Sequence, residues 1–504
     1  MLADYYQRSA VAAAQVLAGF DETWFRSRLE STPVGIALGA DAQTVEGRAL
    51  ADLLVRLCSR LYPALALKGD PAELSRLTEL AKAINPNIEI VNDAELGATI
   101  GDGTPFQTTV YTGSDGWDGL ISASEAQTVG LSDNPFGPAV AACLGAAGIF
   151  RAVFLPDWKE RIDTQVRFSA LAGDTVDAPT QTSFAPPWRL EDDAVLVGAG
   201  AIGQGALWAL SRAPLHGRLH VIDMEVIELS NLQRYVLTDR SDDDRAKVDI
   251  AAQLDSSLEL VPHPTDLAAF LEANGYDWDA MLLALDSARD RVSAQASLPR
   301  FIANAWTQPG DLGVSSHPHF GDAGACVACL YLPETTLKNE DELVAETLGV
   351  PHLLMQVRTL LATSQPVDRG LLEGVAQAVN QPLQALLPFE GRTIRELYVE
   401  GFCGGAVIPI GEAGQLHDAA HEAHVPLAHQ SALAGILLAA ALIRRATIGD
   451  HQVTQVTRLD VLRPVGEFLR QPLLARRNGR CICDDPDFVR IHQAKYESHR
   501  ADVQ

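Results

Sequence analysis

The sequence predicts an α/β protein that contains two doubly wound sheets, and the second sheet has the clearer signal. An apolar run at 194–197 leads into a turn with three glycines, and a helical pattern follows the turn. The next apolar run, 218–222, ends in the acid Asp223. Strand, glycine turn, helix and second strand form the βαβ unit that opens such a sheet. The three glycines are Gly198, Gly200 and Gly203.

Glycine suits this turn because the backbone bends tightly there and can approach a phosphate group closely. The turn therefore indicates a bound nucleotide, which from the turn alone could be NAD, FAD or ATP.

The N-terminal third has the pattern of a worn copy of the same architecture. An apolar run at 33–40 stands where the glycine turn would begin, and a helical stretch follows it. Residues 116–125 parallel residues 276–286 of the second copy. This region has neither the full glycine pattern nor an acid equivalent to Asp223, so we expect a repeat that has lost its nucleotide site. An unrelated α/β domain is the alternative.

Changes in composition divide the chain. Residues 174–188 are rich in Thr, Pro and Ser and are typical of a linker, and residues 334–403 interrupt the α/β pattern with helical stretches. We expect the degenerate copy at 1–173, the linker at 174–188, the second copy at 189–333 and 404–504, and a helical insertion at 334–403.

The overall charge limits the choice of partner. The 504 residues contain 39 Lys and Arg against 65 Asp and Glu, a net charge of −26. This balance argues against nucleic acid or an anionic membrane, because phosphate binding needs a basic face, and it is compatible with a positively charged protein partner. The apolar windows 139–150 and 431–443 are shorter than a membrane span and are followed by arginine.

The N-terminus lacks the order of a signal peptide, and seven cysteines are too few for a disulfide framework. We therefore expect a cytoplasmic protein whose cysteines serve as metal ligands or nucleophiles.

Polar residues after Asp223 go beyond what a dehydrogenase requires. An enzyme that attacks the α-phosphate of ATP needs donors that neutralise charge on phosphorus and an acid that holds Mg²⁺. Asn231, Arg234 and Lys247 have the right chemistry for donors, and Asp286 follows a predicted strand. Any one of these alone is more simply a solvated surface residue.

Together these residues resemble the ThiF/MoeB-type adenylyltransferases, a family that includes the ubiquitin-activating enzymes. The resemblance covers roughly 190–335 and resumes at 425–435. It implies two Rossmann-like adenylation-type domains, the first degenerate, and an ATP site formed by the glycine turn and Asp223. It also implies that Asn231, Arg234 and Lys247 contact the ribose and phosphates of ATP and that Asp286 binds Mg²⁺. One departure is that no Gln follows Arg234-Tyr235.

The resemblance also implies partners. Family members adenylate the C-terminal glycine of a ubiquitin-like protein, and in many of them an arginine near the partner's N-terminus reaches the ATP site. Arg8 is the candidate for that arginine here, in an internal pseudo-dimer that could be monomeric or homodimeric. A chain of two copies is similar to the activating enzymes of bacterial ubiquitin-like conjugation operons that serve in antiviral defence, where a conjugating enzyme receives the modifier.

Four of the cysteines form two pairs. Their thiolates could close a tetrahedral Zn²⁺ site, as the family often has, although the second pair is Cys-x-Cys instead of Cys-x-x-Cys. Ordinary reduced thiols are the alternative. The pairs are Cys326 with Cys329 and Cys481 with Cys483.

Cys403 stands between a β-like run and two glycines at the end of the helical insertion. Its place in the chain matches where thioester-forming activating enzymes have their nucleophile, so we expect Cys403 to form the thioester. A small buried hydrophobe is the alternative for this residue. The second functional hypothesis is an adenylyltransferase for a sulfur-carrier protein, without a thioester relay.

Overall fold

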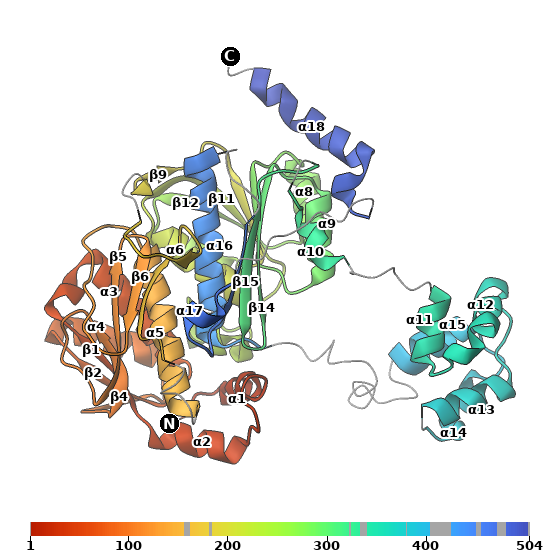
Figure 1. Cartoon of the computed structure of the whole chain (residues 1–504), viewed down its shortest axis with the longest axis horizontal. Helices are drawn as coiled ribbons and strands as arrows, with labels where there is room; N and C mark the ends of the chain where they lie inside the picture. Colours follow the sequence, from red (N-terminus) through yellow and green to blue (C-terminus); the bar gives the residue numbers. More distant parts are fainter. Residues whose placement is uncertain are drawn as a thin grey trace. The chain divides into compact units, whose positions relative to one another are not determined.

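The computed structural model describes residues 2–155, 162–180, 184–321, 324–332, 340–379, 381–403, 425–449, 455–470 and 480–501 (Figure 1). The chain divides into two compact units. One consists of Met1–Leu332 together with His424–Gln504, and the other is Pro333–Ala423.

The first sheet has the strand order β3-β2-β1-β4-β5-β6-β7-β8. The strands from β3 to β5 are parallel, and β6, β7 and β8 continue the sheet in antiparallel pairs. We call this sheet with its helices the first copy. Its strands are β1 (Val34–Leu38), β2 (Ala64–Lys68), β3 (Glu89–Val91), β4 (Leu96–Ile100), β5 (Thr108–Asp115), β6 (Asp118–Ser122), β7 (Gln165–Ser169) and β8 (Asp174–Thr175).

The second sheet repeats this order as β12-β11-β10-β13-β14-β15-β16, again parallel up to its fifth strand and antiparallel afterwards. The predicted repeat of a doubly wound fold is thereby confirmed, and we call this part the second copy. Its strands are β9 (Trp188–Arg189), which pairs with β11, β10 (Ala194–Val197), β11 (Leu215–Ile222), β12 (Leu258–His263), β13 (Ala280–Leu283), β14 (Phe301–Gln308), β15 (Asp311–His317) and β16 (Gln455–Asp460).

The long helices that precede the last strands of each copy pack against each other at the centre of the larger unit (Figure 1). α3 (Val45–Ser59) and α6 (Ala201–Arg212) follow the first strand of each copy, and α5 (Phe136–Phe154) and α16 (Ala428–Ile448) precede the last strands. Close approach of α6 to α16 depends on Gly205 and Gly435: a Cβ on Gly435 would lie 2.1 Å from the Ile202 carbonyl oxygen.

The remaining helices of the larger unit are shorter or peripheral. They are α1 (Tyr6–Ala14), α2 (Glu22–Ser31), α4 (Pro71–Ile84), α7 (Asp249–Ala252), α8 (Leu267–Asn274), α9 (Ala288–Ala296), α10 (Val327–Tyr331), α17 (Val465–Phe468) and α18 (Pro486–Ala501).

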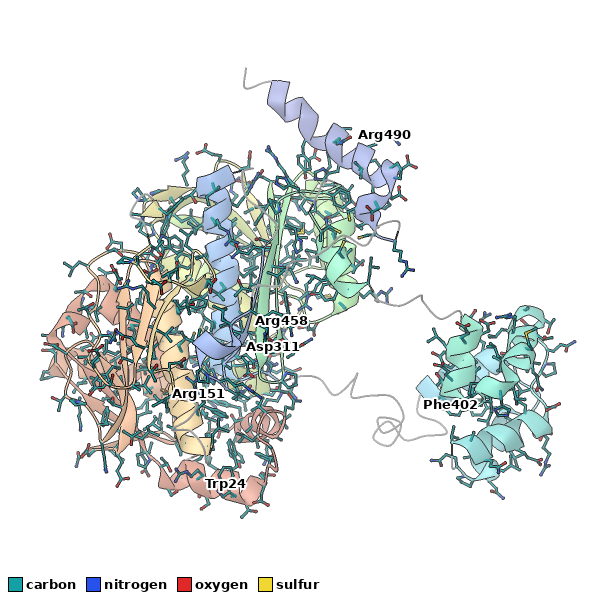
Figure 2. The ribbon with its side chains drawn as sticks, in the orientation of Figure 1. Trp24, Arg151, Asp311, Phe402, Arg458 and Arg490 are labelled. Carbon is teal, nitrogen blue, oxygen red and sulfur yellow. The ribbon has the colours of Figure 1, made fainter. Side chains whose placement is uncertain are left out.

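α5 and α16 are longer than the apolar windows in the sequence suggested. They have 19 and 21 residues, so the length expected from the windows was too short, and by length and composition alone both helices could cross a membrane. Arginine does not end either helix, because Arg151 lies inside α5 and Arg444 lies inside α16. Arg151, which is labelled in Figure 2, pairs with Asp163 at 2.5 Å. The apolar windows of α5 and α16 are 100% and 78% buried within the protein, as is typical of core helices.

The segment predicted as a linker is docked on the first copy where the structure describes it. Thr180 donates hydrogen bonds to the buried Asp118 from its amide (2.9 Å) and its hydroxyl (2.5 Å). The indole nitrogens of Trp117 and Trp188 both donate to the Phe184 carbonyl oxygen, at 2.8 and 3.1 Å. Side chains such as Asp118 and Trp117 thus form hydrogen bonds with this segment, which the composition of the segment does not reveal.

The smaller unit, Pro333–Ala423, is helical in the residues described and has its own apolar core. Its helices are α11 (Glu340–Thr347), α12 (Leu354–Thr363), α13 (Arg369–Ala378), α14 (Leu383–Leu386) and α15 (Ile394–Glu396), followed by a π-helical segment, Leu397–Cys403. The helical character predicted for the insertion is confirmed.

Candidate nucleotide site

The glycine turn connects β10 to α6 and leaves room above the start of the helix. Gly198 has a φ of +98°, and a Cβ there would lie 2.6 Å from the Ala284 carbonyl oxygen. A Cβ on Gly200, by contrast, would meet only the ring end of Tyr235, with the hydroxyl at 3.4 Å. Gly200 is the N-cap of α6 and provides no side-chain cap, so the first amides of α6 are available to an anion such as a phosphate.

Asp223 is fixed beside this turn by backbone amides. Its Oδ2 accepts a hydrogen bond from the Ala199 amide (2.8 Å), and its Oδ1 accepts one from the Glu225 amide (2.9 Å). The sequence-predicted acid therefore lies next to the glycine turn, where it can accept a hydrogen bond from a ribose hydroxyl.

Two of the predicted cations lie beside the ring of Tyr235. The guanidinium carbon of Arg234 lies 5.4 Å from the centre of the Tyr235 ring, and the ammonium of Lys247 lies 5.5 Å from it. Lys247 is buried and pairs with Glu225. Burial alone would lower the pKa of Lys247, but Tyr235, Asp223 and Glu225 outweigh it and raise the pKa, so this side chain stays charged.

Asn231 shapes the turn that carries Arg234. It is buried in the 3₁₀ turn Leu229–Gln233, and its side-chain oxygen accepts a hydrogen bond from the Glu228 amide (3.0 Å). The sequence predicted a ligand contact for Asn231. The structure adds a capping role that holds the start of the Arg234 segment.

α1, which carries Arg8, packs against the 3₁₀ turn that precedes Arg234. Burial lowers the pKa of Arg234, and the positive charge of Arg8 lowers it further. The Arg8 Nε and the Arg234 Nη1 are both buried and have no hydrogen-bond partner among the described residues. The N-terminal segment is held here by apolar packing of Tyr5 on Leu232 and by an ion pair between Asp4 and Arg240. Two cations that each have a buried nitrogen without a partner in the described part of the chain form an environment suited to an anion.

Asp286 is exposed on the loop after β13, and a buried arginine secures that loop. Arg291 donates hydrogen bonds to the carbonyl oxygens of Leu285 and Ala305, the latter at 3.1 Å, and to the Tyr331 hydroxyl at 3.1 Å. Arg291 accompanies Asp286 in the order of residues that resembles the ThiF/MoeB-type family, but its partners could not be predicted, because they are brought together only by the fold. A carboxylate in this place has the oxygen ligands that Mg²⁺ prefers.

The equivalent turn of the first copy is closed. The oxygen Oδ1 of Asp102, on the loop after β4, accepts a hydrogen bond from the Ala40 amide at 2.8 Å. A Cβ on Gly39 would lie 2.1 Å from that same oxygen. A carboxylate of the chain itself therefore occupies the position where the second copy leaves room for a phosphate.

The four predicted metal ligands come together away from the glycine turn. Their sulfur atoms lie within 4.8 Å of one another, and all four cysteines are buried. The sulfur–sulfur distances are 4.0 Å (Cys326–Cys329), 3.4 Å (Cys326–Cys481), 3.4 Å (Cys329–Cys481) and 3.6 Å (Cys329–Cys483). A tetrahedron with Zn–S bonds of about 2.3 Å has sulfur–sulfur edges of about 3.8 Å, so the four thiols fit such an ion despite the Cys-x-Cys spacing.

The remaining cysteines differ in accessibility. Cys58 and Cys143 are fully buried in α3 and α5, and burial raises the pKa of Cys58 to about 12 and that of Cys143 further. Cys403 ends the π-helical segment of the smaller unit, and its side chain lies outside the described part of the structure.

Two family models match the chain. The description "ThiF family" matches residues 190–466, and "Prokaryotic E2 family C" matches residues 39–155 of the first copy. The first copy was predicted to be adenylation-like, and its strand order is that of the second copy, whereas this match bears a different family name.

Individual proteins are also similar to the chain. "Uncharacterized protein y4jF" of Sinorhizobium fredii is 40% identical over 511 residues, covering 98% of this chain and 97% of that protein. "Adenylyltransferase and sulfurtransferase UBA4" of Saccharomyces cerevisiae is 29% identical over 190 residues, 34% of this chain and 42% of that protein. Among solved structures, E. coli MccB with ATP has a TM-score of 0.35 and 12% identity, covering 58% of this chain and 66% of MccB. The ThiF family model covers more than half of the 504 residues, and the chain therefore belongs to the ThiF family.

Proposed function

We propose that the second copy uses ATP to adenylate the C-terminal glycine of a ubiquitin-like protein. The observation that carries this proposal is a pair of arginines, Arg8 and Arg234, each with a buried nitrogen that has no hydrogen-bond partner among the described residues. Arg234 lies beside the ring of Tyr235, whose hydroxyl faces Gly200 of the glycine turn. A triphosphate would supply the missing acceptors. A dinucleotide needs no such set of cations.

The adenylation step follows from these side chains. A carboxylate oxygen of the modifier attacks the α-phosphorus of ATP, a new P–O bond forms, and the bond to the bridging oxygen breaks to release pyrophosphate. The cations Arg8, Arg234 and Lys247 would neutralise the charge that develops on the phosphates. Asp286 would hold Mg²⁺, which supplies further charge neutralisation when bound.

We further propose that Cys403 then takes the acyl group as a thioester and that a separate conjugating enzyme receives it. The match of residues 39–155 to an E2 family raises the alternative that the first copy is itself the acceptor. Cys58 and Cys143 are the cysteines of that region, and both are buried with raised pKa values. A thiol of that kind is a poor nucleophile, which favours an acceptor on another protein.

An adenylyltransferase for a sulfur-carrier protein is the second candidate. The similarity to UBA4, whose name includes both adenylyltransferase and sulfurtransferase, favours it. Both candidates share the ATP site and differ only in whether Cys403 carries an acyl group.

ATP–pyrophosphate exchange tests the shared step. We expect exchange only when a ubiquitin-fold protein with a free C-terminal glycine is present, and we expect Asp286→Ala and Arg8→Ala to lose it. Asp290→Ala and Arg48→Ala are matched controls, because both residues are exposed and neither belongs to the predicted set of site residues. Undiminished exchange in Asp286→Ala, or reduction of NAD in its place, would reject the proposal.

A further inference from the structure

Two arginines of the first copy hold the loop of the second copy that carries Arg234 and Tyr235. Arg60, at the C-terminal end of α3, is 1% exposed. Its Nε donates to the Tyr235 carbonyl oxygen (3.1 Å), and its Nη2 donates to the carbonyl oxygens of Tyr235 and Thr238, the latter at 2.6 Å. One turn earlier, Arg56 Nη1 donates to the Val236 carbonyl oxygen at 3.0 Å.

The buried Arg60 side chain and the loop carbonyl oxygens depend on each other for hydrogen-bond partners. A buried guanidinium is costly unless its donors are paired, and Arg60 pairs them with backbone carbonyls and not with an acid. The loop is held from its other side by Gln204 of α6, whose side-chain oxygen accepts a hydrogen bond from the Leu237 amide (3.0 Å). Residues 235–238 are therefore clamped between equivalent helices of the two copies.

The clamped loop leads directly to the nucleotide site. Tyr235 is the ring beside Arg234 and Lys247, and its hydroxyl faces the space above Gly200. A shift of the Tyr235 backbone would displace that ring and Arg234 together. Misplacement of such groups by about 1 Å can cost roughly 100-fold in rate.

We propose that Arg60, assisted by Arg56, is a positioning residue for the ATP site, and that this is a role of the first copy in addition to supplying Arg8. The inference rests on the proposed function of the second copy. It gives a physical reason for retaining the first copy although its own glycine turn is filled by Asp102.

Arg60→Lys tests the proposal, because lysine keeps the charge but lacks the planar guanidinium, from which Arg60 donates through two separate nitrogens to the carbonyl oxygens of Tyr235 and Thr238. Arg444→Lys is the matched control: Arg444 of α16 donates to the first-copy Leu171 carbonyl oxygen (3.1 Å) and to Ser316 (2.9 Å), away from the clamped loop. In pyrophosphate exchange with the full chain, we expect Arg60→Lys to raise the KM for ATP by about tenfold or more, and Arg444→Lys to leave it within about twofold.

A second measurement keeps the inference independent of activity. Hydrogen–deuterium exchange of the full chain should show faster exchange at 235–238 in Arg60→Lys and wild-type protection there in Arg444→Lys. Equal effects of the two variants, or unchanged KM and protection in Arg60→Lys, would overturn the proposal. If Arg60→Lys does not fold, Arg56→Lys carries the same test through Val236. If the wild type shows no ATP–pyrophosphate exchange, the proposed function fails. The hydrogen–deuterium exchange at residues 235–238 still decides whether Arg60 holds the loop.

Discussion

The carboxylate of Asp52 in α3 accepts a hydrogen bond at 3.0 Å from the indole nitrogen of Trp208 in α6. Equivalent helices of the two copies are thus joined at their junction. Arg56 and Arg212 pair with the same carboxylate at 2.8 and 3.1 Å, one from each copy. A buried acid of the first copy is therefore shared by side chains of both copies at this junction.

Asp52→Asn should destabilise the larger unit. Removing one partner of a buried ion pair leaves uncompensated charge and costs about 3–5 kcal/mol. Because the two arginines are partly exposed, we expect a loss of about 3 kcal/mol. Urea unfolding at pH 7 measures it. The control is Asp93→Asn, because Asp93 forms an exposed pair with Lys68 and its loss should be undetectable. Equal stability of the two variants would contradict a central role for Asp52.

The same carboxylate should make stability depend on acid pH. Burial alone raises the pKa of Asp52, but Arg56, Arg212 and the Trp208 hydrogen bond outweigh it, and the folded-state pKa is lowered. A lowered pKa adds stability that is fully present above the ordinary value of about 3.9 and is lost as the pH falls through the folded-state pKa. Unfolding measured below about pH 4 should therefore show a flatter pH dependence in Asp52→Asn than in the wild type.

The sequence alone predicted those features of the fold that depend on residues close together in the chain. The glycine turn with Asp223, the repeat and the helical insertion are of this kind, since each depends on periodicity or on turn residues. The roles of Arg60 and Arg291 could not be predicted, because their partners are backbone carbonyls brought close only by the fold. The docking of the segment near Thr180 on the first copy could not be predicted either, because its partner Asp118 is distant in the sequence. The four cysteines could be predicted as a set because pairs of thiols are rare enough to be informative even when Cys329 and Cys481 lie 152 residues apart in the sequence.

Gly435 tests the contact between α6 and α16. A Cβ on Gly435 would lie 2.1 Å from the Ile202 carbonyl oxygen, so Gly435→Ala should force the helices apart at a cost of about 1–3 kcal/mol. Gly374 in α13 is the opposite case, because a Cβ there meets nothing within 4 Å. Gly374→Ala should raise the stability of the smaller unit by about 0.5–1 kcal/mol through helix propensity. Calorimetry of both variants checks the two signs, and a tolerated Gly435→Ala would contradict the packing.

The cysteine cluster should bind one zinc ion per chain. Elemental analysis of freshly purified protein measures the content, and a chelator should lower the melting temperature because metal binding contributes folding free energy. Cys483→Ser should lose the metal and expose α18, since Cys481 and Cys483 connect that helix to α10. Cys143→Ser is the control: it should retain the zinc although Cys143 is equally buried. Zinc-free protein with full stability in chelator would reject the site.

Cys403 separates the two candidate functions. If it is the nucleophile, its thiolate attacks the acyl-adenylate, a thioester forms, and AMP leaves with the electrons of the broken acyl–phosphate bond. Incubation with ATP, Mg²⁺ and the modifier should then give a species heavier by one modifier, which thiol reductant removes. Adenylation does not use this thiol, so Cys403→Ala should keep pyrophosphate exchange and lose the heavier species.

Cys58→Ala is the matched control for that experiment, because Cys58 belongs to the region similar to an E2 family but is buried in α3. It should retain the heavier species. Persistence of the species in Cys403→Ala and its loss in Cys58→Ala would move the thioester to the first copy, which would then have to open to expose a thiol whose pKa burial raises to about 12. Robust pyrophosphate exchange without any heavier species would favour the sulfur-carrier adenylyltransferase, because in that reaction the acyl-adenylate is formed but Cys403 does not take up the acyl group.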